Sequence, residues 1–253
     1  MSDAFAVVQA ARAPRPYTVR GLIDGLVDGF VELHGDRGYG DDAAILGGIG
    51  QLAEMPVTVI ATVKGDTLQE RLATHFGGPE PWGYRKAERL MRQAAKFRRP
   101  ILTLVNTPGA YPGQEAEELG QGSAIASLLT TAATLPVPMI AVIIGEGGSG
   151  GALALAAGDQ VWMTDQAMYA VLSPEGFASI LWKDVTRAHE AADVMGLTPD
   201  ALKAAGVVER IVPDTGLALA ADLKQALIPA FTALRQMAPA DLLAARRARF
   251  AQF

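Results

Sequence analysis

The chain has 253 residues, of which 50% are hydrophobic and 19% are charged, a composition typical of a folded protein. Its formal net charge is −5, so we expect no broad basic surface and no nucleic-acid partner. Cysteine is absent, which excludes disulfides, a thiolate nucleophile and a cysteine-ligated zinc site within this chain.

Membrane and secretory segments are not expected either. The longest apolar stretch, 135–144, is interrupted by Pro136 and Pro138, and a spanning helix needs about 18 apolar residues. The first residues lack the apolar core of a secretory signal. We therefore expect a soluble protein of the cytoplasm with no membrane partner.

In the first 16 residues, Pro14 and Pro16 indicate an N-terminal arm. Apolar residues at spacings of three and four then predict a helix from Tyr17 to Gly35. Further along, strands alternate with helices. The strands are expected at 57–63, 101–105, 139–144, 161–164, 168–172 and 207–212, and the helices at 84–97, 115–133, 151–157 and from about 216 to 253.

This alternation predicts βαβ crossovers and a largely parallel sheet. The helix expected at 151–157 is short, and two closely spaced strands follow it. That rhythm favours a superhelix of ββα units over a flat doubly wound sheet. We expect a single α/β domain over 1–253, with 1–16 as an arm and about 216–253 as C-terminal helices.

The most informative segment is Gly145-Glu-Gly-Gly-Ser-Gly-Gly, which joins a buried strand to a helix. Glycine permits a sharp turn and a close approach of ligand to backbone. The first amides of a helix lack intrahelical partners, and the positive end of the helix dipole lies behind them. The segment therefore favours binding of an anion or a developing oxyanion, against the simpler alternative of a tightly packed turn.

Three functional interpretations compete for this segment. Gly-x-Gly-x-x-Gly from residue 145 matches a dinucleotide fingerprint, with Asp165 placed to bind a ribose. Gly-x-Ser-x-Gly centred on Ser149 matches a nucleophile elbow, for which His189 is the only downstream histidine. In the third interpretation, the backbone amides of Gly150 and Gly151 hold the oxyanion of an enolate or of a ureido group.

Several neighbouring residues bear on the choice. The segment 107–113, Thr-Pro-Gly-Ala-Tyr-Pro-Gly, also follows a strand and supplies a second loop, while Ser173 reads as a helix N-cap. Lys64, at the end of a strand, is either a solvated cation or a ligand for a phosphate or carboxylate across a subunit boundary. His34 and His75 are too isolated to indicate a metal site.

Six motifs in one order carry a resemblance to a known family. From about Arg15 to beyond Pro213 the chain resembles the α subunits of the carboxyltransferase of bacterial acetyl-coenzyme A carboxylase, in a short form without their N-terminal helical extension. The motifs are Arg15-Pro-Tyr-Thr, His34-Gly-Asp-Arg, Tyr84-Arg-Lys-Ala, Thr107-Pro-Gly-Ala-Tyr-Pro-Gly, Gly145-Glu-Gly-Gly-Ser-Gly-Gly-Ala-Leu-Ala and Ser173-Pro-Glu-Gly-Phe-Ala-Ser-Ile-Leu-Trp-Lys.

The resemblance implies a ClpP/crotonase-like fold and a biotin-dependent reaction. A carboxyl group passes from carboxybiotin, borne on the biotin carboxyl carrier protein, to acetyl-coenzyme A, giving malonyl-coenzyme A for fatty acid synthesis. A separate β subunit, in an α2β2 assembly, would supply most of the acyl-coenzyme A site and a zinc ribbon. No covalently bound cofactor and no metal are implied for this chain.

The resemblance also implies roles for particular residues. Because the reaction passes through an enolate and an anionic ureido oxygen, it needs preorganised N–H donors and no histidine base. The backbone of Gly150 and Gly151 would form the catalytic oxyanion hole. The substrate-binding residues would be Gly147 and Gly148, which shape the loop, and Gly109 and Ala110, which line the cleft. Lys64 is added to this set from its position at the end of a strand.

Three positions depart from the family pattern. Asn106 stands where the family usually has Asp, Asp66 where it tends to have Arg, and Leu119 where Arg is usual. These changes leave open an alternative function as a diverged, non-catalytic assembly paralogue. A second alternative is a serine hydrolase that uses Ser149.

Overall fold

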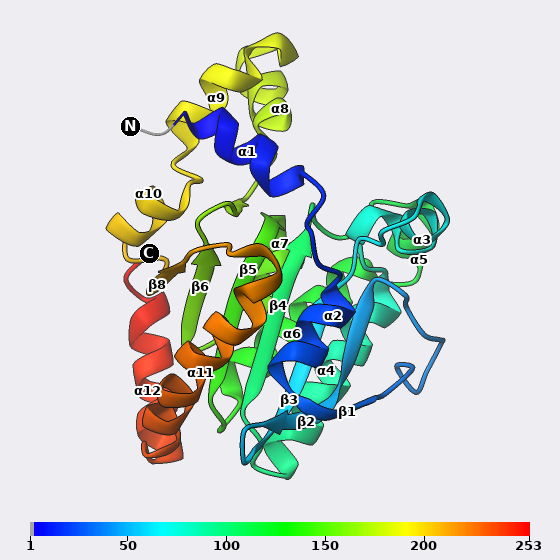
Figure 1. The fold of residues 1–253 in the computed structure, drawn as a ribbon. Helices are drawn as coiled ribbons and strands as arrows, with labels where there is room; N and C mark the ends of the chain where they lie inside the picture. Colours follow the sequence, from blue (N-terminus) through cyan, green and yellow to red (C-terminus); the bar gives the residue numbers. More distant parts are fainter. Residues whose placement is uncertain (1–2) are drawn as a thin grey trace.

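The computed structural model describes residues 3–253 and contains an eight-stranded sheet with helices on both faces (Figure 1). The strands lie in the order β1-β2-β3-β4-β5-β6-β8, and β7 pairs with the far end of β5. They are β1 (Asp28–Glu32), β2 (Ile45–Leu52), β3 (Met55–Thr62), β4 (Ile101–Thr107), β5 (Met139–Gly148), β6 (Gln160–Thr164), β7 (Met168–Ala170) and β8 (Arg210–Val212).

Twelve α-helices surround this sheet within residues 3–253. They are α1 (Ala4–Arg12), α2 (Val19–Leu26), α3 (Leu68–Ala73), α4 (Pro81–Lys96), α5 (Gln114–Glu118), α6 (Gln121–Thr134), α7 (Ser149–Ala156), α8 (Pro174–Phe177), α9 (Ala188–Met195), α10 (Pro199–Ala204), α11 (Leu219–Arg235) and α12 (Pro239–Phe250).

The central strands are parallel and buried on both faces. β3, β4, β5, β6 and β8 pair in parallel, while β1, β2 and β3 pair antiparallel at one side. Alternate residues of each strand point to opposite faces. Ile101 and Ile143 therefore pack with α4, α6 and α7, whereas Leu102 and Val142 pack with α2 and α11.

The helix α11 has the length and composition of a membrane span. The segment Gly216–Arg235 is the one candidate found within residues 3–253. In the structure, however, Leu219, Leu223 and Phe231 are buried against the sheet together with residues of α2. Only 28% of the apolar window is buried, so one face of this helix packs on the sheet and the rest of its surface does not.

The N-terminal arm folds back on its own chain. Its helix α1 packs on α9 with Val8 and Ala11 buried, and it lies beside the end of β5 (Figure 1). Asp3 caps the helix by accepting hydrogen bonds from the amides of Phe5 and Ala6. The arm thereby brings Arg12 close to the glycine segment at the end of β5.

The helix expected from Tyr17 to Gly35 was wrong in its second half. α2 ends at Leu26, and β1 follows with Gly29 at φ +62°. The apolar residues of 27–31 fit both periods, and pairing with β2 decides in favour of a strand. β2 itself was missed, because Gly47, Gly48 and Gly50 hide its strand pattern.

Other boundaries also moved. The single helix expected at 115–133 is split into α5 and α6 by Gly120, which has φ +87°. The strand expected at 139–144 continues to Gly148, because Gly147 pairs with β4 and residues 146–148 pair with β7. The strands expected at 168–172 and 207–212 are shorter, ending at Ala170 and beginning at Arg210.

Candidate functional site

The glycine segment forms the junction between β5 and α7. Gly145–Gly148 are buried in the strand, and the chain turns at Ser149, whose φ is +57°. A left-handed serine is a strained conformation that the surrounding structure must hold. The turn places Gly150 and Gly151 in the first turn of α7, where backbone N–H groups lack intrahelical acceptors.

The loop after β4 packs directly against this junction. A Cβ atom at Gly148 would lie 2.0 Å from the carbonyl oxygen of Pro108. A Cβ atom at Gly151 would lie 2.6 Å from the nitrogen of Ala110 and 2.3 Å from the hydroxyl of Tyr84. The structure therefore brings Gly148 and Gly151 against the 108–110 backbone, which includes Gly109.

Gly150 differs from these neighbours. The nearest atom to a Cβ built on Gly150 is Cγ2 of Ile125, at 3.8 Å. The residue is half-buried and Ser149 beside it is exposed. A Cβ here would make only an ordinary van der Waals contact, so packing within the chain gives no reason for glycine at this position.

Two further glycines of the segment allow close packing of the strand end that carries the loop. A Cβ at Gly147 would lie 2.9 Å from the Tyr169 ring, so this residue permits the close pairing with β7. A Cβ at Gly145 would lie 2.4 Å from Oδ1 of Asn106. That oxygen accepts a hydrogen bond from the backbone N–H of Glu146 at 3.0 Å. Asn106 thus supplies the acceptor that an aspartate would also supply.

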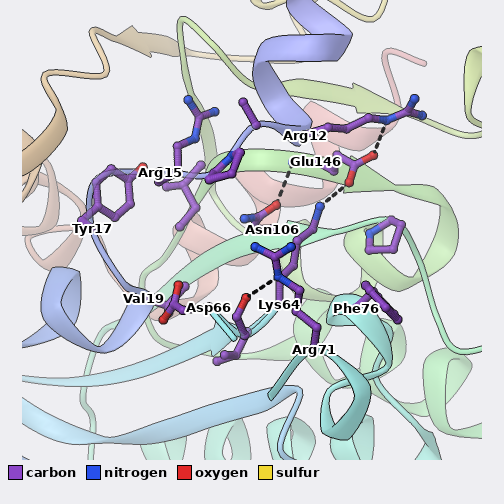
Figure 2. A pocket seen from close by; sticks show the side chains of 16 residues that line it. Arg12, Arg15, Tyr17, Val19, Lys64, Asp66, Arg71, Phe76, Asn106 and Glu146 are labelled. Atoms are coloured by element: carbon purple, nitrogen blue, oxygen red, sulfur yellow. Dashed lines mark hydrogen bonds and ion pairs between the residues drawn. The ribbon is translucent and has the colours of Figure 1, made fainter. Parts of the chain in front are cut away.

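A cavity of about 510 Å³ adjoins the segment, and Lys64 lines it (Figure 2). The ammonium of Lys64 is not free, because it contacts Oε2 of Glu146. The other carboxylate oxygen accepts a hydrogen bond at 2.9 Å from Nε of Arg12. Sequence reasoning missed both Glu146 and Arg12; the available signal was a lone acid inside a run of glycines.

Arg12 joins a second carboxylate as well. Its terminal nitrogens donate to both oxygens of Glu175, at 2.7 and 3.0 Å. These hydrogen bonds lower the pKa of Glu175 and raise the pKa of Arg12 above its ordinary value. Glu175 lies in the first turn of α8, which Ser173 caps by accepting from the amide of Gly176.

Tyr84 lies beneath the two loops. It is fully buried, and burial raises the pKa of its phenol. Within residues 3–253 its hydroxyl has no hydrogen-bond partner, although it lies close to Gly151. Buried polar groups normally have a hydrogen-bond partner. The Tyr84 hydroxyl is therefore a free hydrogen-bonding group directly beneath the glycine loop, as far as residues 3–253 show.

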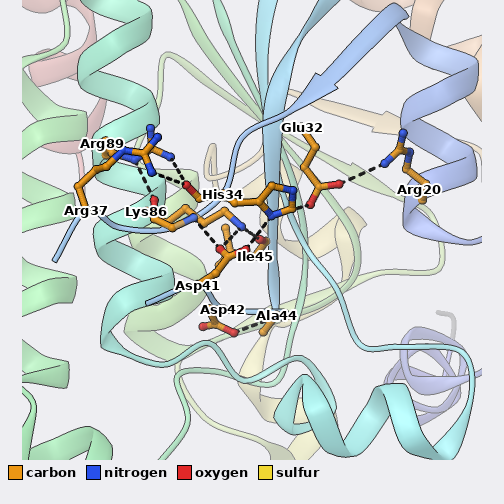
Figure 3. A network of polar contacts seen from close by, with 11 residues as sticks. Arg20, Glu32, His34, Arg37, Asp41, Asp42, Ala44, Ile45, Lys86 and Arg89 are labelled. Carbon is orange, nitrogen blue, oxygen red and sulfur yellow. Dashed lines mark hydrogen bonds and ion pairs between the residues drawn. The ribbon is translucent and has the colours of Figure 1, made fainter. Parts of the chain in front are cut away.

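A separate polar network connects the His34-Gly-Asp-Arg segment to α4 (Figure 3). Asp41 accepts from Nδ1 of His34 at 2.7 Å and binds the ammonium of Lys86 at 2.6 Å. Arg89 donates to the carbonyls of Gly35 and His34. Lys86 and Arg89 of α4 therefore hold this loop.

Within residues 3–253, Ser149 has no hydrogen bond to a histidine that could act as its base. His189 lies in α9, where its ring packs on Phe5 and contacts Asp3 at 3.4 Å. The ring of His75 stacks on Tyr111 with a centroid distance of 3.8 Å. Among the hydrogen bonds of residues 3–253, none joins Ser149 to either ring.

Comparison with solved structures defines the fold. The chain superposes on 12S transcarboxylase, solved with methylmalonyl-coenzyme A and methylmalonic acid, with a TM-score of 0.74, 21% identity and 92% of this chain covered. For the β subunit of geranyl-CoA carboxylase from P. aeruginosa the TM-score is 0.67, with 18% identity and 93% coverage. The chain spans 44% and 43% of these longer chains. The fold is that of the crotonase-like carboxyltransferases, which confirms the expected α/β superhelix.

Sequence comparison then identifies the family. Residues 2–253 match the family model described as acetyl co-enzyme A carboxylase carboxyltransferase-like. The chain is 52% identical over 256 residues to the acetyl-coenzyme A carboxylase carboxyl transferase subunit alpha of Streptococcus equi subsp. equi (strain 4047), with 100% of both chains covered. The chain therefore belongs to the acetyl-coenzyme A carboxylase carboxyltransferase family, among its short-form α subunits, and is a biotin-dependent carboxyltransferase.

Proposed function

We propose that this chain, together with a β subunit, transfers the carboxyl group of carboxybiotin to acetyl-coenzyme A in the cytoplasm, giving malonyl-coenzyme A for fatty acid synthesis. The observation that carries the proposal is that Gly150, at the start of α7 and next to the 108–110 loop, has room for a Cβ without a clash. All the neighbouring glycines of the segment are explained by packing, and this one is not. A ligand that approaches the backbone there would explain it.

The chemistry needs what this junction offers. The bond between the ureido nitrogen of biotin and the carboxyl carbon breaks, and a carbon–carbon bond forms at the methyl carbon of acetyl-coenzyme A. The proton lost from that methyl group ends on the ureido nitrogen, so no histidine base is required. The negative charge on the ureido oxygen would be stabilised by the N–H groups of Gly150 and Gly151, each such donor contributing roughly a hundredfold in rate.

The remaining site residues take supporting roles in this proposal. Gly147 and Gly148 shape the loop through their close contacts with Tyr169 and Pro108. Gly109 and Ala110 would line the cleft in which the ligand is held. Lys64 would reach a substrate carboxylate or phosphate only by exchanging its present partner, Glu146.

The proposal includes an α2β2 assembly in which the β subunit supplies most of the acyl-coenzyme A site and a zinc ribbon. Carboxybiotin would be presented by the biotin carboxyl carrier protein. An apolar surface supports the presence of a partner, because exposed large hydrophobics that gather in one segment mark interaction sites. The segment 171–185 has four that are more than half exposed, namely Val171, Ile180, Leu181 and Val185.

The test begins with co-purification of the chain with a β subunit and an assay of the reverse reaction, transfer from malonyl-coenzyme A to free biotin. Gly150→Ala adds a methyl group that clashes with no atom of the chain, and we expect turnover to fall about a hundredfold because ligand approach is blocked. Gly122→Ala is the matched control, since this glycine is also helical and has nothing within 4 Å of a Cβ.

Three other outcomes are distinguishable. Full activity of Gly150→Ala would refute the oxyanion role of this backbone. A wild-type complex that assembles without carboxyl transfer would favour the non-catalytic paralogue. Ester hydrolysis that is abolished by Ser149→Ala would favour the hydrolase.

A further inference from the structure

Glu146 occupies an unusual place for an acid. It is the residue of β5 directly before Gly147 and is 7% exposed. A buried carboxylate is stable only when it is paired and hydrogen-bonded, so its partners must stay in place. Both oxygens have cationic partners, Arg12 and Lys64, which come from distant parts of the chain (Figure 2).

Arg12 connects three elements through one guanidinium. It ends α1, donates from Nε to Glu146 in β5, and holds Glu175 in α8 with its other two nitrogens. A planar guanidinium that binds two carboxylates fixes their relative orientation as well as their charge. The N-terminal arm thereby restrains the strand end from which the glycine loop departs.

Lys64 is itself held by a strained segment. His75, Phe76 and Gly77 have φ values of +46°, +55° and +87°, three successive left-handed residues. A Cβ at Gly77 would lie 2.6 Å from Cγ of Lys64, so this backbone packs against the lysine stem. The hydroxyl of Thr74 also donates to the Lys64 carbonyl at 2.8 Å. Strain of this kind persists only where the surroundings impose it.

We infer that Arg12 and Lys64 are positioning residues that act through Glu146 to fix the β5–α7 junction, so that the amides of Gly150 and Gly151 face the ligand. This inference rests on the proposed function for the identity of the ligand. It assigns the N-terminal arm a part in the reaction, through the contact of Arg12 with Glu146. It also gives Lys64 a role within the chain, in place of direct contact with substrate.

The test uses the complex with the β subunit and measures turnover and KM separately. Arg12→Ala frees one oxygen of Glu146, and we expect kcat to fall roughly ten- to hundredfold, as small displacements of catalytic groups do, with the KM for malonyl-coenzyme A unchanged. Arg12→Lys should recover part of the loss, since lysine can still hold one carboxylate. Lys64→Met should likewise lower kcat and leave the KM for malonyl-coenzyme A and the KM for biotin unchanged.

Arg20→Ala is the matched control, because Arg20 also binds two carboxylates, those of Asp24 and Glu32, but lies away from the junction. We expect it to retain wild-type kcat. If Arg12→Ala and Arg20→Ala behave alike, the positioning role is wrong. If Lys64→Met instead raises the KM for one substrate at unchanged kcat, Lys64 contacts that substrate directly and the inference fails for it.

A second measurement keeps the inference separate from the proposed function. Hydrogen exchange of the amides in 147–151 is read in the isolated chain, with no assay of transfer. Arg12→Ala should accelerate exchange in this segment at least several-fold, and Arg20→Ala should not. Equal exchange in both variants would overturn the inference even in an active complex, whereas an inactive wild-type complex would count against the proposed function alone.

Discussion

Two glycine-rich regions of this molecule, the strand β2 and the β5–α7 junction, look alike in sequence and differ in what surrounds them. In β2, a Cβ at Gly47 would lie 2.3 Å from a Leu90 methyl group, and a Cβ at Gly48 would lie 2.2 Å from the Val31 carbonyl oxygen. At the junction, Gly148 is equally crowded, but Gly150 is not. Glycine therefore indicates function only where the chain itself does not occupy the missing side chain's space.

The largest effect should follow from Gly148→Ala, because its Cβ would meet the backbone of Pro108 at 2.0 Å. Backbone cannot rotate away as a side chain can, so we expect a loss of about 3 kcal/mol in the free energy of unfolding together with loss of carboxyl transfer. Urea unfolding and the reverse-transfer assay measure the two. A variant that is stable yet inactive would show that the 108–110 loop can move.

Gly48→Ala should destabilise the protein by about 2 kcal/mol for the same kind of reason, with its Cβ against the Val31 carbonyl and the Phe30 ring. The partner here is β1, the edge strand of the sheet, which can shift more easily than the core. Turnover per folded molecule should stay at the wild-type value. A fall in turnover at unchanged stability would mean that a change in β2 alters the site, and the contrast between β2 and the β5–α7 junction would then be wrong.

Gly47→Ala should have a smaller effect, about 1 kcal/mol, because the atom it meets is the far end of the Leu90 side chain. A rotamer change of that leucine can relieve the contact. The double variant Gly47→Ala/Leu90→Ala provides the check. If the alanine at 47 causes no further loss once Leu90 is shortened, then side-chain crowding is the reason for glycine at this position.

The central strands of the fold were predictable because they are buried on both faces. β4 and the first six residues of β5 consist almost entirely of apolar or β-branched residues, so their pattern is unambiguous. β2 was missed because its three glycines have no side chains to show a period of two. β1 was assigned to a helix because its five residues are too few to distinguish the helical from the strand period. Only its pairing with β2 determines its conformation.

The glycine junction was also predictable, but its supports were not. Clustered glycines before a helix are visible in any sequence. The pairing of Glu146 with Arg12, however, joins residues 134 positions apart, and nothing local to either predicts it. The arm was recognised only by its prolines, so its docking on α9 and its contact with the site are determined by tertiary structure.

The smallest effect on stability, and the sharpest test of the comparison, belongs to Gly150→Ala. No atom lies within 3.4 Å of the added methyl group, and the backbone there is not left-handed. Since alanine favours a helix over glycine by up to about 1 kcal/mol, the free energy of unfolding should stay the same or rise slightly. Turnover should fall all the same. A variant that keeps its stability and loses turnover would separate Gly150 from Gly47 and Gly48. A substitution that creates no clash and still slows the reaction acts on the binding of the ligand and not on the fold.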